Sequence, residues 1–173
     1  ALQAAGGLLA YLYETQKTDL SHISVFSYYT AGQYMELDLT ARRNLELTET
    51  MRSKEKRGSL LWVLDKTKTA MGKRLIRTWI EQPLLSPAGI TLRQNAVEEL
   101  FENRPLLDDV TEALTGIFDL ERIMTRVVYG SVNGKDLRAL WSALTRLPQL
   151  KALSATFKAT MLRMAVDVEY HNP

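Results

Sequence analysis

The residues with the clearest capacity for chemistry are two carboxylates and two guanidinium groups that lie close together in the sequence. Asp119 and Glu121 precede Arg122 and Arg126, and the two arginines are four residues apart. Such groups form ion pairs, but this set contains no nucleophile and no acid–base pair for catalysis. Two interpretations remain open. One is a surface pair within a single helix, worth roughly 0.3 kcal/mol. The other is a bridge from Asp119, Glu121 or Arg122 to a neighbouring helix.

Other reactive residues are too scattered to form a site. His22 and His171 lie far apart, and neither has a partner at the spacing of metal ligands. Residues 70–74 contain Gly-Lys but lack the upstream glycine and the following hydroxyl of a phosphate-binding loop. The sequence has no Gly-x-Ser-x-Gly elbow. It also has no cysteine, which excludes disulfides, thiolate metal sites and a cysteine nucleophile. We therefore expect no catalytic, cofactor-binding or metal-binding residue in this chain.

Positive charge is concentrated in one part of a nearly neutral chain. The formal net charge is +2, yet residues 52–77 carry nine basic side chains against two acidic ones. Lys73, Arg74 and Arg77 belong to this run, and the two arginines share one side of a helix because they are three residues apart. The run indicates either an ordinary solvated surface or a local basic patch.

The hydrophobic pattern predicts the elements that must position these groups. A helix is predicted over residues 1–17, and β-branched and aromatic residues predict a strand at 23–29. Apolar and acidic residues alternate over 34–39, which predicts a second strand. The glycine-containing link at 31–33 would join the two strands into a small hairpin.

Residues 35–47 are the predicted joint between this hairpin and the helices that follow. Thr40 is the predicted N-cap of a short helix over 40–45. Leu39 and Leu45 are expected to be buried, together with Leu47. Three polar residues of the same stretch are expected to tie helix ends across the joint: Arg42, Arg43 and Asn44.

Everything after residue 39 favours helices. The predicted N-caps are Ser59, Thr69, Ser86 (followed by Pro87) and Asp119. Pro148 is expected to kink or end the helix that starts near Lys135, which leaves one interrupted helix or two consecutive ones. All three tryptophans fall on apolar helical faces and are predicted core residues: Trp62, Trp79 and Trp141. No apolar run approaches the length of a membrane span.

Four segments, taken in order, resemble the DNA mismatch repair ATPases of the MutS family. AAGGLLAYL at 4–12 is similar to the last helix of the connector domain, and MELDLTARRNLEL at 35–47 resembles the entry to the core domain. Residues 59–84 resemble the central helices of the core, and residues 119–140 resemble the approach to its long lever helix. The resemblance covers about residues 4–153 and is strong because all four segments occur in the family's order.

The resemblance implies a mainly α fold, a multi-helix core and lever domain with a small N-terminal β-hairpin. Residues 1–20 would be the C-terminal helix of the connector domain, and residues 21–39 the β-hairpin at the junction. Residues 40–173 would be the helical core domain with the start of the lever helix, truncated before the clamp that touches DNA. The chain starts without methionine and in mid-pattern, so we expect it to be an excised fragment.

The resemblance also implies a function for the parent protein and a mechanical role for this segment. The parent would bind mismatched duplex DNA, hydrolyse ATP with Mg²⁺, form a homodimer, recruit a MutL-type partner and be cytoplasmic, without a membrane. The segment would be non-catalytic and would couple the ATPase to the DNA-binding clamp. Its basic surface (Lys73, Arg74, Arg77) would face DNA phosphates or an acidic neighbouring domain. Structural ties are expected from Arg42, Arg43, Asn44, Asp119, Glu121 and Arg122.

Two alternatives remain open. The first is the core of a MutS relative that binds branched DNA. The second is a stand-alone helical protein-interaction module, with Tyr28, Tyr29 and Trp141 as surface anchors.

Overall fold

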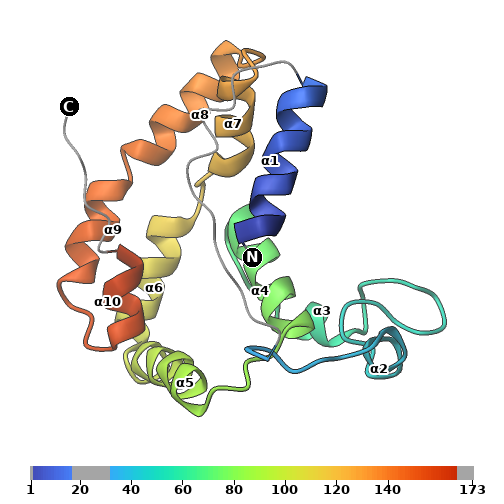
Figure 1. Ribbon diagram of the computed structural model, residues 1–173. Helices are drawn as coiled ribbons and strands as arrows, with labels where there is room; N and C mark the ends of the chain where they lie inside the picture. The colour runs from blue at the N-terminus through green and yellow to red at the C-terminus, as the bar shows by residue number, and fades with distance from the viewer. Residues whose placement is uncertain (1, 17–31, 167–173) are drawn as a thin grey trace. The chain divides into compact units, whose positions relative to one another are not determined.

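The computed structural model describes residues 2–16 and 32–166, and these residues divide into two units (Figure 1). The first unit spans Ala1–Gln33 and the second Tyr34–Pro173. The described part of the first unit is dominated by α1 (Leu2–Gln16), which confirms the helix predicted there. The predicted strand at 23–29, His22 and His171 lie outside the described residues. No described helix is long and apolar enough to cross a membrane.

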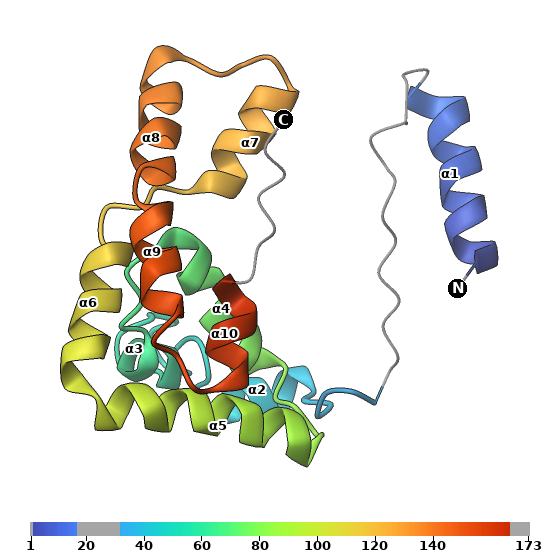
Figure 2. The ribbon, with the colours of Figure 1, turned by 90° about the vertical axis from the view of Figure 1, so that its left-hand side faces the viewer.

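The second unit is built from short helices, as the sequence predicted. They are α2 (Leu39–Asn44), α3 (Leu60–Leu64), α4 (Ala70–Glu81), α5 (Pro87–Glu102), α6 (Arg104–Leu114), α7 (Leu120–Val128), α8 (Gly134–Leu144), α9 (Leu147–Ser154) and α10 (Thr160–Val166). Within this unit α8 leads into α9 along one side, α6 lies beside α9, and α5 runs across the base against α10 (Figure 2).

Most of the predicted helix starts are fixed by N-cap residues that can be recognised in the sequence. Ser59, Thr69, Ser86 and Asp119 each accept a hydrogen bond from a backbone N–H of the first turn of the following helix, which confirms all four predicted caps. The cap of α2 is different. Asp38 accepts a bond from the N–H of Ala41 at 2.6 Å, so the helix begins at Leu39 and the prediction of Thr40 as its cap was wrong.

The predicted β-hairpin is not seen in the described residues, because residues 34–38 form no strand. Tyr34 makes one isolated antiparallel bridge to Leu84, and the N–H of Met35 donates to the carbonyl of Pro83 at 2.8 Å. The alternating pattern is thus satisfied by a single contact with the chain that leaves α4. One bridge satisfies few backbone groups, and a stable sheet needs more than one pair of strands.

Fewer leucines of the joint at 35–47 are buried than the sequence predicted. Leu47 is 7% exposed, as expected, but Leu39 is 84% and Leu45 60% exposed, so both were wrongly assigned to the core. Only Leu39 lies within α2, while Leu45 is its C-cap and Leu47 follows the helix, so the three leucines do not share one helical face.

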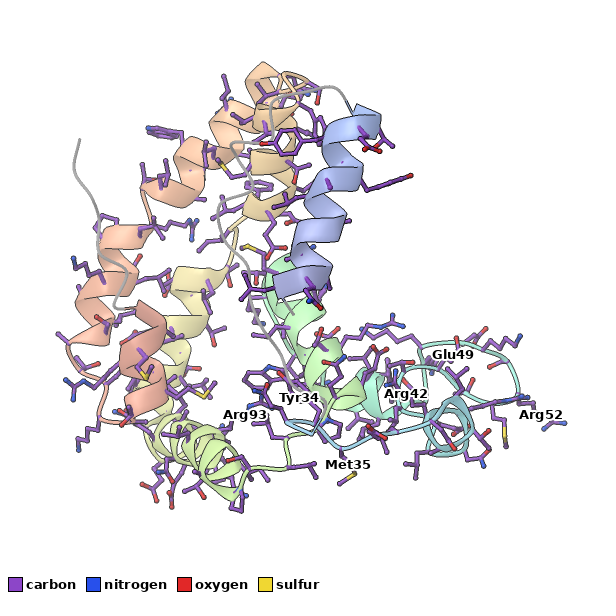
Figure 3. All side chains as sticks on the ribbon, in the orientation of Figure 1. Tyr34, Met35, Arg42, Glu49, Arg52 and Arg93 are labelled. Atoms are coloured by element: carbon purple, nitrogen blue, oxygen red, sulfur yellow. The ribbon has the colours of Figure 1, made fainter. Side chains whose placement is uncertain are left out.

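The core of the second unit consists mainly of small and aliphatic side chains from α3, α5, α6, α7 and α8 and from segments between helices. Its apolar members are Leu47, Leu61, Ala96, Leu106, Ala113, Ile117, Ile123, Ala143 and Phe157. The tryptophans were predicted there, but Trp62 is 48% and Trp141 66% exposed. Trp79 is partly buried, and the guanidinium of Arg93 stacks 3.6 Å from the centre of its ring. Burial lowers the pKa of Arg93, and Tyr34, which lies nearby, opposes that shift (Figure 3).

The predicted break before Pro148 is present, and two consecutive helices result. The first, α8, ends at Leu144; α9 begins at Leu147 and carries Pro148 in its first turn. Proline is tolerated at that position because the N–H it lacks would have no partner within the helix.

Candidate functional site

A polar contact of three hydrogen bonds joins the middle of α4 to the start of α7. The guanidinium of Arg74 donates two hydrogen bonds to Asp119: Nη1 to Oδ2 at 2.8 Å and Nη2 to Oδ1 at 2.7 Å. Nη2 also donates to Oε2 of Glu121 at 2.5 Å. Asp119 and Glu121 therefore contact the neighbouring helix α4, and a pair confined to α7 does not describe this site.

Asp119 has two roles in this contact. Its Oδ1 accepts a hydrogen bond from the N–H of Arg122 at 3.3 Å, which caps α7. The Arg74 guanidinium holds the pKa of Asp119 below its usual value. The carboxylates of Asp119 and Glu121 in turn raise the pKa of Arg74. A bidentate arginine–carboxylate pair fixes orientation as well as distance. Arg74 therefore fixes the start of α7 relative to α4.

A second tie joins α7 to α8. Nη1 of Arg126 lies 2.5 Å from Oδ1 of Asp136, a residue that is only 8% exposed. Asp136 also completes a capping box: its Oδ2 accepts from the N–H of Asn133 at 3.2 Å, and Asn133 Oδ1 accepts from the N–H of Asp136 at 3.0 Å. The sequence analysis grouped Arg126 with Arg122 and did not identify Asp136 as its partner. The capping-box spacing was the signal that could have identified Asp136.

Two further ties connect a side chain with the backbone at a distant helix end. Nη1 of Arg146 donates to the carbonyl of Thr115 at 2.6 Å, just beyond the end of α6. Glu99 of α5 accepts from the N–H groups of Lys158 and Ala159 at 2.8 and 2.6 Å, just before α10. Both satisfy backbone groups that have no partner within a helix. No local pattern announces either residue, because each partner is more than thirty residues away.

The predicted structural residues of the joint do not all act alike. Nε of Arg42 donates to the carbonyl of Leu37 at 2.9 Å and so ties α2 to the segment before it. Arg43 and Asn44 are exposed, and neither side chain has a partner in the part of the chain that the structure describes.

The three predicted basic-patch residues differ in how they are paired. Arg74 is committed to Asp119 and Glu121, and Nε of Arg77 pairs with Glu81 of the same helix at 2.9 Å. Lys73 is exposed and has no side-chain partner among residues 2–16 and 32–166. Two of the three charges are therefore balanced within the chain.

Another tie joins the segments on either side of α3. Nζ of Lys56 lies 2.5 Å from Oδ2 of Asp65, whose side chain is 5% exposed. Thr67 donates to Oδ1 of the same carboxylate at 2.6 Å. The hydrogen bonds from Lys56 and Thr67 lower the pKa of Asp65 to about 2, so this carboxylate remains charged at neutral pH.

The described residues offer ties between helices and no cluster that could hold a metal. Among them, no group of three or more histidine, cysteine, aspartate or glutamate residues is arranged to bind an ion. The carboxylates at the centre of the site are engaged by arginines and backbone N–H groups. The arrangement is suited to holding helices at fixed positions.

Comparison with known proteins identifies the family. Residues 40–169 match the family described as MutS domain III. DNA mismatch repair protein MutS from Ruminiclostridium cellulolyticum is 52% identical over 163 residues, which is 94% of this chain and 19% of that protein. The proteins of the same name from Lachnoclostridium phytofermentans and Clostridium novyi are 49% and 48% identical over 162 residues, or 94% of this chain.

These relatives also set the extent of the match. The chain spans about a fifth of the length of the curated relatives it matches. The aligned stretch is longer than residues 40–169 and therefore includes residues outside the domain. The match to the domain covers most of the chain and includes α3 to α10 with the ties that join them. The chain belongs to the MutS family, and residues 40–169 are its MutS domain III.

Proposed function

We propose that this chain is the structural and allosteric core segment of a longer DNA mismatch repair protein of the MutS type. In that role it would couple an ATPase to a DNA-binding clamp and would not itself catalyse a reaction. The observation that carries the proposal is the bidentate pair between Arg74 and Asp119, with Glu121 added to it. It fixes one helix against another, which is what transmission of a rigid-body movement requires.

The mechanical argument follows from how the ties are distributed. Charged side chains link α4 to α7, α7 to α8, the end of α6 to Arg146, and α5 to the start of α10. A displacement of α4 would therefore carry α7 and α8 with it, because moving one helix without the others would break charge-assisted hydrogen bonds. Coupling of this kind is allosteric when two states exist and both distant sites bias them.

We propose the following division of the chain. Residues 1–20 are the end of the connector domain, residues 21–39 the junction, and residues 40–173 the core with the start of the lever. The separation of the two units between Gln33 and Tyr34 supports a boundary within the junction. The hydrogen bond from Met35 to Pro83 supports a fixed attachment where the second unit begins.

For the whole protein we propose binding of mismatched duplex DNA, hydrolysis of ATP with Mg²⁺, homodimerisation, a MutL-type partner and a cytoplasmic location. The name that the three relatives share, DNA mismatch repair protein MutS, favours this over a relative that binds branched DNA. It also favours this over a stand-alone interaction module.

The proposal is tested by comparing this chain with the full-length protein. We expect the isolated chain to bind matched and mismatched duplexes weakly and equally and to hydrolyse no ATP, because the coupling role includes neither activity. The full-length protein should prefer the mismatched duplex and release it when ATP is added. Fluorescence anisotropy and a phosphate-release assay measure both. Clear mismatch preference by the isolated chain would contradict the proposal.

We also propose that the surface of Lys73, Arg74 and Arg77 faces an acidic neighbouring domain or DNA phosphates. Arg74 and Arg77 are already paired with carboxylates of this chain, so Lys73 is the unbalanced charge of the three. Because one unbalanced charge is few for contacts with DNA phosphates, this supports an acidic neighbouring domain as the partner. In the full-length protein, the double variant Lys73→Glu/Arg77→Glu should then leave the salt dependence of duplex binding unchanged. A slope of log Kd against log salt that is shallower by about 2 would instead support phosphate contacts.

A further inference from the structure

The segment between α2 and α3, residues 50–58, is a folded turn. The N–H of Thr50 donates to the carbonyl of Glu55 at 2.9 Å, and the N–H of Lys54 donates to the carbonyl of Thr50 at 3.0 Å. The hydroxyls of Thr50 and Ser53 are 2.7 Å apart, and Glu46 accepts from the N–H of Met51 at 2.7 Å. These bonds hold the backbone of a segment in which every side chain from 51 to 58 is exposed.

Lys54 occupies a backbone conformation that disfavours it. Its φ is +54°, in the left-handed region where glycine and asparagine are the usual residues. A lysine there lowers the stability of the turn relative to either of those residues, so nothing in the backbone explains its presence. Its charged side chain is what it contributes, and that side chain has no partner in the described structure.

A second basic segment is held beside this turn. The ion pair between Lys56 and Asp65 joins the end of the turn to the residues after α3, and Thr67 donates to the same carboxylate. Lys66 and Lys68 flank Thr67, and both are exposed. The only lysine of the turn that is neutralised is therefore the one that brings the two segments together.

Five cations thus remain exposed with no side-chain partner among the residues that the structure describes: Arg52, Lys54, Arg57, Lys66 and Lys68. We call them the turn cations. Arg52 extends outward from the turn, on the side away from the other helices of the second unit (Figure 3). The acidic residues of the turn and its approach, Glu49 and Glu55, form no ion pair with them in the described structure.

We propose that the turn cations are a docking surface for the phosphate backbone of duplex DNA. This inference rests on the proposed function, since it gives this segment a direct contact with the DNA that the whole protein binds. Backbone docking needs a preorganised row of cations and no base-reading group. The hydrogen-bonded turn fixes the backbone that carries Arg52, Lys54 and Arg57, and the pair between Lys56 and Asp65 ties the segment with Lys66 and Lys68 to it.

The composition of the turn favours DNA over an acidic protein. Protein interfaces are centred on aromatic or large apolar anchors with charges at the rim. Met51 is the only large apolar side chain of residues 50–58, and it is 50% exposed. Trp62 of α3 is the nearest aromatic residue in the sequence, so its removal distinguishes the two kinds of partner.

The test uses the full-length protein and a matched duplex without a mismatch. The variant Arg52→Ala/Lys54→Asn/Arg57→Ala removes three turn cations, and asparagine at 54 suits the left-handed backbone. The control Lys135→Ala/Arg138→Ala/Lys158→Ala removes three exposed charges elsewhere. We expect the turn variant to bind about tenfold more weakly, with a salt slope shallower by about 1 for each lost phosphate contact. The thermal midpoint should not fall, because asparagine is better suited than lysine to the backbone at position 54.

Each outcome decides one question. If affinity and slope match the control, the inference is overturned while the proposed function stands, provided that the wild-type protein still prefers a mismatch. If the wild type shows no such preference, the proposed function fails. If the duplex slope is unchanged but poly-glutamate binding depends on the turn cations and is weakened by Trp62→Ala, the surface belongs to an acidic protein and the DNA assignment is wrong.

Discussion

Replacing Asp136 with alanine is expected to lower the free energy of unfolding of the second unit by about 2–3 kcal/mol. The side chain is 8% exposed and completes the cap of α8 while it pairs with Arg126. Removing it leaves the N–H of Asn133 and a partly buried guanidinium without their acceptor. Denaturant unfolding of the whole chain, followed by circular dichroism, measures the loss.

Asp108 provides the matched control for this prediction. It is an exposed aspartate within α6, and Asp108→Ala should change the free energy of unfolding by less than about 0.5 kcal/mol. Asp136→Asn keeps an acceptor for the cap but removes the charge, and it should fall between the two. An Asp136→Ala variant as stable as the Asp108→Ala variant would show that the link between α7 and α8 contributes little.

Under the proposed function, replacing Arg74 with methionine is expected to uncouple the two ends of the segment in the full-length protein. Methionine keeps much of the apolar stem and removes all three bonds to Asp119 and Glu121. We expect the ATP-driven acceleration of DNA release to fall about fivefold, the lower end of typical allosteric coupling. Mismatch affinity without ATP should change much less. Stopped-flow release of a labelled mismatched duplex measures the effect.

Arg77 provides the matched control for the Arg74 prediction. It lies on the same helix and forms its ion pair with Glu81, four residues away within α4. Arg77→Met removes a pair of similar chemistry that joins no second helix. It should therefore leave ATP-driven release close to that of the wild type. Equal losses in the two variants would mean that charge on α4, and not its link to α7, is responsible.

The sequence predicted contacts between residues that are close together in the chain and missed contacts between residues that are far apart in it. Ser59 and Asp119 were identified as caps because a cap and its helix are neighbours in the chain. The partner of Arg74 could not be identified in this way, because Asp119 is 45 residues away and only the fold brings the two together. Glu99, whose partners lie 59 and 60 residues away, was missed for the same reason.

Burial was the least predictable property. Helical periodicity identifies an apolar face but does not say whether anything covers it. Trp141 lies on such a face and is 66% exposed, while Ala143, two residues away, is fully buried. The short alternating segment at 34–38 was read as a strand, yet a single bridge to Leu84 satisfies it. In each case the missing information was the contact made by a distant segment.

The claim at the centre of this account is that the contact between Arg74 and Asp119 transmits movement. A double-mutant cycle on ATP-driven release of mismatched DNA by the full-length protein tests it most directly, using Arg74→Met, Asp119→Asn and the two together. Asparagine can still cap α7, so the cycle isolates the link between helices. We predict that each single variant loses most of the acceleration and that the double variant loses no more. Losses that multiply in the double variant would show that the two residues act independently and would contradict the account.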